Sequence, residues 1–200
     1  NSTTIMLAMD ISGSMCSTDV EPNRLTVAQE AAVSFIESQD GETKIGLVAF
    51  AGVAGLQVPP TTDKDALTEA IDNFTTARGT AIGSAILTSI DSIAAINPTV
   101  APSGVDPESA QRSGYAADVI VVLTDGANTQ GVEPAEAAES AAVRGLRVFT
   151  IGFGTTTPTR MACTGRQAGG WAAGGPGGGF GGRGGRSPRV IDEATLQAVA

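Results

Sequence analysis

The chain has 200 residues, of which 42% are hydrophobic, and this suits one globular domain with a sizeable core. Its formal net charge of −9 argues against nucleic-acid binding across the surface and suits a cationic ligand. The sequence has no histidine, which excludes Ser-His-Asp and Cys-His catalysis and histidine-ligated zinc. No apolar stretch is long enough to span a bilayer, so we expect no direct membrane insertion by this domain.

Apolar runs and amphipathic segments alternate in the first part of the chain. Residues 4–9 are apolar without alternation, which predicts a strand buried on both faces. After Pro22, one helical face collects Leu25, Ala28, Ala32, Phe35 and Ile36. Residues 44–50 and 55–60 follow as two strands close in sequence, which predicts a hairpin and hence one antiparallel edge strand.

The same alternation continues to the end of the chain. Asp63 is expected to cap a helix that runs to about Phe74. Further on we predict helices at 84–96, 134–144 and from 190 onward, strands at 117–126 and 146–154, and a surface loop at 98–114. Strands that alternate with helices predict an open, doubly wound, mostly parallel α/β sheet with helices on both faces.

Residues 165–186 form a glycine-rich insertion that buries too little apolar surface to offset its ordering entropy. Its segment Phe180–Arg186, "FGGRGGR", resembles an RGG element that binds RNA. One short copy in an acidic domain argues against that role, so we expect no nucleic-acid partner. Trp171 and Phe180 are candidates for contact with a protein partner.

Polar clusters follow the predicted strands at the end of the sheet where ligands bind in α/β folds. They contain Asp10, Ser12, Ser14, Thr80 and Asp125. These oxygen ligands suit Mg²⁺ first, and Mn²⁺ or Ca²⁺ second. Simpler readings remain open: a strand-end turn at 10–14, a helix cap at Thr80 and a turn at Asp125. We expect Asp19 and Glu21 to be solvated or to cap a helix, with no role at a metal.

The stretches "DISGSM", "RGTAIG" and "LTDG" together resemble the metal-ion-dependent adhesion site of the von Willebrand factor A domain family. That site combines a D-x-S-x-S motif with a separate Thr and a separate Asp. The phrases "DVEPNRLTVAQEAAVSFI", "IGLVAFAG" and "VFTIGFGT" are most similar to bacterial membrane-anchored members of the aerotolerance type. The resemblance implies a single domain over residues 1–200 with a Rossmann-like fold. It also implies strand order 3-2-1-4-5-6, with the last edge strand and final helix missing from this sequence.

The resemblance further implies a role for each residue. Ser12 and Ser14 would ligate Mg²⁺ directly, while Asp10 would act through water and hydrogen bonds. Thr80 and Asp125 would ligate directly or through water. An open position would accept an Asp or Glu carboxylate from a partner protein, so the domain would be a binding module and not an enzyme.

Two rival functions remain open at this stage. A Mg²⁺-dependent phosphohydrolase would also place aspartates at strand ends, but Ser12 stands where an aspartyl-phosphate enzyme would have a second Asp. Arg78 is the only basic residue that the sequence places near the site. The other rival is a structural interaction module with a non-functional metal site.

The two cysteines, Cys16 and Cys163, both follow predicted strands and so lie on one rim. They either pair in a disulfide or remain two separate small apolar side chains. The sequence begins directly on a strand, without an initiator methionine or a basic leader, as an excised domain would. We therefore expect membrane association through segments outside this sequence and an extracytoplasmic domain.

Overall fold

A computed structural model describes residues 3–126, 128–155, 160–168 and 192–200. Its strands are β1 (Thr4–Asp10), β2 (Lys44–Phe50), β3 (Ala54–Thr61), β4 (Val119–Thr124) and β5 (Arg147–Gly152). They form one sheet in the order β3-β2-β1-β4-β5. The β2–β3 pair is antiparallel and the other pairs are parallel, which confirms the predicted sheet and its antiparallel edge strand.

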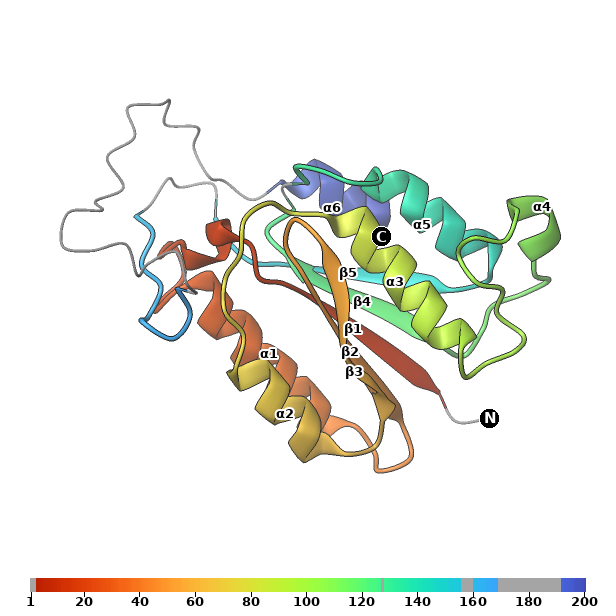
Figure 1. The fold of residues 1–200 in the computed structure, drawn as a ribbon, viewed down its shortest axis with the longest axis horizontal. Helices are drawn as coiled ribbons and strands as arrows, with labels where there is room; N and C mark the ends of the chain where they lie inside the picture. The colour runs from red at the N-terminus through yellow and green to blue at the C-terminus, as the bar shows by residue number, and fades with distance from the viewer. Residues whose placement is uncertain (1–2, 127, 156–159, 169–191) are drawn as a thin grey trace.

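Helices cover both faces of this sheet. The helices among the described residues are η1 (Gly13–Cys16, a 3₁₀ helix), α1 (Arg24–Ser38), α2 (Lys64–Asp72), α3 (Ile82–Ala94), α4 (Pro107–Ala110), α5 (Pro134–Val143) and α6 (Glu193–Val199). In Figure 1, α1 and α2 lie below the sheet, whereas α3, α5 and α6 lie above it. The doubly wound architecture is therefore confirmed.

The core consists of two clusters because the sheet is buried on both sides. Along β1, Met6 and Ala8 pack toward α3 and α5, while the alternate residues Leu7 and Met9 pack toward α1 and α2. Alternation along a strand sends successive side chains to opposite faces. A continuous apolar run in the sequence is the consequence, since both faces need apolar side chains.

Some boundaries differ from the prediction. Helix α3 begins at Ile82 rather than at Ser84, because the side chain of Asn128 accepts a hydrogen bond from Ile82 N at 3.0 Å. The predicted loop at 98–114 contains the short helix α4, which Asp106 caps. Much of the glycine-rich insertion, with Trp171, Phe180 and the RGG-like stretch, lies outside the described residues.

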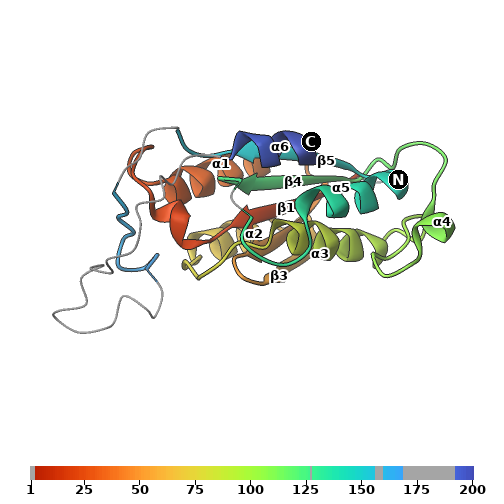
Figure 2. The ribbon, with the colours of Figure 1, turned by 90° about the horizontal axis from the view of Figure 1, so that it is seen from above.

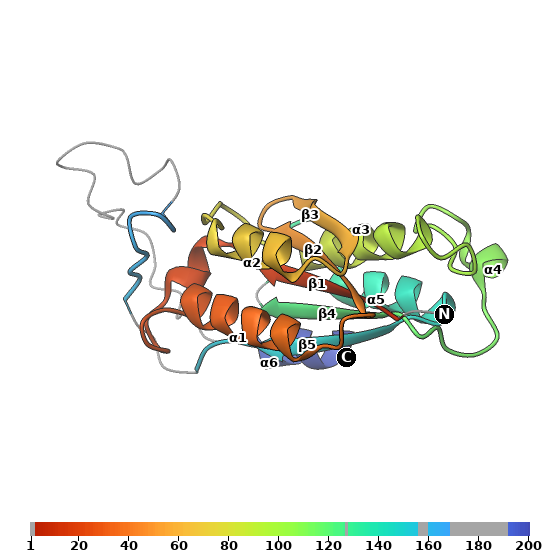
Figure 3. The same ribbon diagram turned by 90° about the horizontal axis from the view of Figure 1, so that it is seen from below.

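The parallel strands bring the polar clusters to one end of the molecule. In Figure 3 the arrows of β1 and β4 point to the same end. Figure 2 shows α4 at the opposite end. The rim formed by the carboxyl ends of β1 and β4 is where a parallel α/β sheet places its ligands.

Candidate metal and partner-binding site

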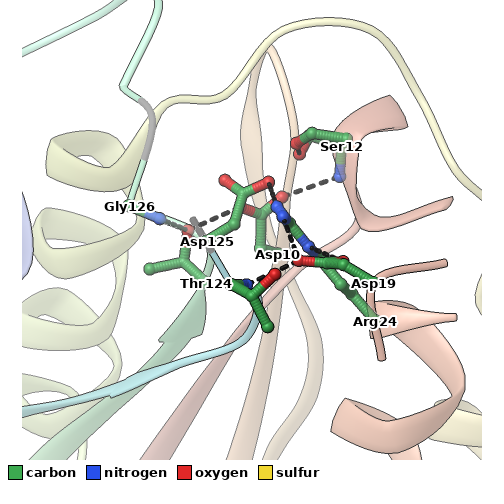
Figure 4. A network of polar contacts seen from close by, with 9 residues as sticks. Asp10, Ser12, Asp19, Arg24, Thr124, Asp125 and Gly126 are labelled. Carbon is green, nitrogen blue, oxygen red and sulfur yellow. Dashed lines mark hydrogen bonds and ion pairs between the residues drawn. The ribbon is translucent and has the colours of Figure 1, made fainter. Parts of the chain in front are cut away.

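Asp10 is the last residue of β1 and is completely buried. Its Oδ1 accepts a hydrogen bond from Ser12 N at 2.7 Å, and its Oδ2 accepts one from Thr124 Oγ1 at 2.6 Å. These bonds come from the segments that follow β1 and end β4, as Figure 4 shows. Asp10 therefore fixes the relative position of the two strand ends.

Ser12 and Ser14 lie on the turn that follows Asp10. Their hydroxyl oxygens are 2.9 Å apart. Ser12 precedes the 3₁₀ helix η1, but its side chain makes no capping hydrogen bond to that helix. In a simple strand-end turn, this hydroxyl would hydrogen-bond to the backbone. The two hydroxyl oxygens instead lie close to each other, which favours a binding site for a cation.

Asp125 follows β4 and is 1% exposed. The next residue, Gly126, has a φ of +85°, and a Cβ there would come within 2.5 Å of Asp192 O. Gly126 N donates to Thr124 Oγ1 at 3.1 Å, so this hydroxyl serves both the Asp10 carboxylate and the turn at Asp125. Glycine is required here because the turn is left-handed and tightly packed.

Backbone hydrogen bonds place Thr80 at the same rim. Ala77 N donates to Ile11 O at 2.8 Å, which places the segment before Thr80 beside the Ser12 turn. Thr80 N donates to Thr129 Oγ1 at 2.8 Å, and Thr129 N donates to Thr80 O at 2.9 Å. The residue that caps α3 is Ala81, so Thr80 is not the helix cap. Within the described residues, no hydrogen bond joins its side chain to the other predicted site residues.

Sequence reasoning missed Arg24, which is the first residue of α1 and is not part of the apolar face predicted for this helix. The residue is completely buried, and its Nη1 donates to Asp125 Oδ2 at 3.0 Å. Its Nε and Nη2 donate to Asp19 at 2.8 and 2.7 Å. The expectation that Asp19 is solvated or capping is therefore wrong, and so is the expectation that Arg78 is the only basic residue at the site. The two partners of Arg24 lie 5 and 101 residues away in the sequence, so no pattern within the helix indicates that this arginine is buried.

The carboxylates respond differently to burial. Burial raises the pKa of Asp10, and the negative charge of Asp125 raises it further. Hydrogen bonds from Ser12 and Thr124 oppose this in part, and the net result is a pKa raised to about 7. Burial also acts to raise the pKa of Asp19, but Arg24 and the amide of Thr155 outweigh it and lower that pKa to about 2. Asp10 and Asp125 therefore repel each other across the rim, and a cation between them would relieve that repulsion.

In the structure Cys16 and Cys163 form a disulfide with a Cα–Cα distance of 4.8 Å. Backbone hydrogen bonds accompany it, since Ala162 N donates to Cys16 O at 2.8 Å and Thr18 N donates to Arg160 O at 3.0 Å. The segment 160–168 is thus fastened beside the turn that carries Ser14.

The residues at the rim fit a hard, divalent cation. Their side chains offer carboxylate and hydroxyl oxygens, which Mg²⁺, Mn²⁺ and Ca²⁺ prefer. In the part of the chain that the structure describes, no group of three or more His, Cys, Asp and Glu side chains could hold a metal. A site here would therefore depend on Ser12, Ser14 and Thr80 as much as on Asp10 and Asp125.

The fold and this rim define a doubly wound α/β domain of the interaction type. A sequence profile of the von Willebrand factor type A domain matches residues 5–128. The chain belongs to the von Willebrand factor type A domain family. Domains of this family are general protein-interaction modules, typically without catalytic activity.

Mycobacterial proteins are among its relatives. The chain is 36% identical to a UPF0353 protein of Mycobacterium ulcerans over 206 aligned positions, which cover 100% of this chain and 53% of the relative. A UPF0353 protein of Mycobacterium tuberculosis is 35% identical over the same coverage. The chain thus spans about half the length of these curated relatives.

Two solved structures share both fold and sequence with the chain. An aerotolerance-related membrane protein of Bacteroides fragilis is 27% identical with a TM-score of 0.72, covering 99% of this chain and 86% of that one. BatB of Bacteroides thetaiotaomicron is 28% identical with a TM-score of 0.70, covering 99% and 85%. No helix among the described residues is long and apolar enough to cross a membrane.

Proposed function

We propose that this domain binds a partner protein through a divalent cation, Mg²⁺ first and Mn²⁺ or Ca²⁺ second. Ser12, Ser14, Thr80, Asp10 and Asp125 would hold the cation. When bound, it supplies a Lewis-acidic position that an Asp or Glu carboxylate of the partner can occupy. The observation that carries the proposal is the convergence of the Ser12 and Ser14 hydroxyls, 2.9 Å apart, beside buried Asp10.

Charge supports a divalent ion. Asp10, Asp19 and Asp125 form a contiguous buried set with Arg24. With all three carboxylates ionised, as a bound cation would hold them, the set including the guanidinium carries a formal charge of −2. Buried charge without compensation is costly, so a cation of charge +2 is the matching ligand.

The phosphohydrolase reading is less well supported. Both oxygens of Asp10 accept hydrogen bonds, and the side chain has no exposed surface. A nucleophilic carboxylate needs an accessible oxygen to attack phosphorus. If a generic phosphate ester were hydrolysed in an Asp10-dependent manner, the enzymatic reading would replace ours.

A peptide array tests partner binding. Short immobilised peptides, each with a single Asp or Glu, are probed with the domain in Mg²⁺ and again in EDTA. We expect Mg²⁺-dependent retention that Ser14→Ala abolishes and that Ser89→Ala, a change in a buried hydroxyl on α3, preserves. Retention that EDTA leaves unchanged would favour a structural module with a non-functional metal site.

We also propose that the domain works outside the cytoplasm, attached to a membrane by segments outside this sequence. The Cys16–Cys163 disulfide supports an oxidising compartment, and the similar solved structure from Bacteroides fragilis is that of an aerotolerance-related membrane protein. Thiol labelling of the protein as isolated from cells tests this. We expect both cysteines to resist alkylation until a reductant is added, and immediate labelling would contradict the assignment.

A further inference from the structure

Arg24 is placed between two carboxylates at the start of α1. Its Nε and Nη2 form a fork with the two oxygens of Asp19, and its Nη1 reaches Asp125 Oδ2 at 3.0 Å. Figure 4 shows the guanidinium between Asp19 and Asp125. Two donors of Arg24 thus bind Asp19, and a third binds the candidate metal ligand Asp125.

The chain is shaped around this guanidinium. Gly154, after β5, has a φ of +134°, and a Cβ at that position would lie 2.5 Å from Arg24 Cζ. Thr155 N donates to Asp19 Oδ2 at 2.5 Å, so the segment that follows β5 lies against the Arg24–Asp19 ion pair. Enclosure lowers the local dielectric and strengthens the contact with Asp125.

We propose that Arg24 is a positioning residue of the metal site, which orients the Asp125 carboxylate and offsets one of the three buried acidic charges. The inference rests on the proposed function. Residues that hydrogen-bond a metal ligand set its direction, and their loss commonly weakens metal binding by about 10–100-fold. Arginine suits this task because its planar fork engages Asp19 with two donors and retains another for Asp125.

Cation selectivity separates positioning from a purely structural role. Mg²⁺ requires near-ideal octahedral geometry, whereas Ca²⁺ tolerates irregular arrangements of oxygen ligands. A misdirected Asp125 should therefore weaken Mg²⁺ more than Ca²⁺. General destabilisation of the fold would weaken both cations in the same proportion.

The experiment is calorimetric titration of Mg²⁺ and of Ca²⁺ into the native chain, Arg24→Gln and Arg24→Lys. We expect the Mg²⁺ affinity to fall at least about tenfold in both variants and the Ca²⁺ affinity to fall less, so that the Mg²⁺/Ca²⁺ affinity ratio drops. Lysine keeps the charge but cannot form the fork. The Arg24→Lys variant also provides the test if Arg24→Gln fails to fold. The matched control is Arg144→Gln, which changes a second buried arginine among the described residues, 1% exposed and bonded to loop carbonyls, and should preserve the ratio.

The outcomes are distinct. A native chain that binds neither cation overturns the proposed function together with this inference. Normal Mg²⁺ binding by the native chain with an unchanged ratio in the Arg24 variants overturns only the role of Arg24. A native ratio in Arg24→Lys with a low one in Arg24→Gln would assign the effect to charge and also overturn positioning.

Discussion

The hydroxyl of Thr124 links the two carboxylate-bearing turns at the rim. It donates to Asp10 Oδ2 and accepts from Gly126 N, both in buried surroundings. Thr124→Val keeps the shape but removes both bonds. We expect a loss of about 1–3 kcal/mol in the free energy of unfolding, measured by urea denaturation.

Thr150→Val is the control for that substitution. Its hydroxyl, on neighbouring β5, makes a longer bond of 3.3 Å to Leu196 O in a less buried position. It should cost clearly less than Thr124→Val. Equal losses would mean that the Thr124 hydroxyl has no special role in holding Asp10.

Asp10 also predicts the pH dependence of the metal-free protein. Its pKa rises from 3.8 to about 7 on folding, so between these values the folded state binds a proton that the unfolded state has released. This contribution lowers the free energy of unfolding as pH increases from about 4 to about 7. Asp19 acts oppositely, since its lowered pKa stabilises the fold above pH 4 and that stability is lost as pH falls toward 2.

Chemical denaturation in EDTA at several pH values measures the Asp10 effect. The groups that act on Asp10 are Asp125, Ser12 and Thr124, with Arg24 against Asp125. We expect native stability to decline from pH 5 to pH 8 relative to Asp10→Asn, which cannot ionise. If the difference between the two proteins were constant with pH, the raised pKa would be wrong.

At the scale of elements, the disulfide joins η1 to the segment after β5. The linked cysteines are 147 residues apart, so the bond restricts a long stretch of the unfolded chain. The double variant Cys16→Ser/Cys163→Ser should lose about 2–5 kcal/mol of unfolding free energy. Denaturation of the native chain with and without a reductant checks this.

The double variant supplies the control for that measurement. A reductant should lower the stability of the native chain to that of the double variant and should leave the double variant unchanged. Equal stability of oxidised and reduced native protein would contradict a stabilising role for the disulfide.

The sequence predicted elements well where the signal is local. Strand β1 is an unbroken apolar run, and Asp63 caps α2 by accepting from Ala66 N. The start of α3 was missed because the side chain that accepts from Ile82 N, that of Asn128, comes from another loop. Arg24 was missed for the same reason, since an arginine on an amphipathic helix normally faces water and only the folded chain reveals its partners.

At the scale of the whole molecule, topology assembles the rim from distant segments. The strand order β3-β2-β1-β4-β5 makes β1 and β4 neighbours, and this brings residues 10–14 close to Asp125. The opposite end of the sheet carries Asp118, just before β4, whose carboxylate accepts from Thr4 N at 2.8 Å and Asn97 Nδ2 at 2.6 Å. Asp118 and Asp125 are thus buried acids at the two ends of one strand, and only Asp125 belongs to the candidate site.

This pair provides the most direct test of the account. Mg²⁺ is titrated calorimetrically into the native chain, Asp125→Asn and Asp118→Asn. We predict that the native chain and Asp118→Asn bind Mg²⁺ with similar affinity. Asp125→Asn should lose more affinity than the roughly 10–100-fold typical of changes to residues that only support a ligand. No binding by the native chain, or the same affinity in Asp125→Asn, would contradict the account.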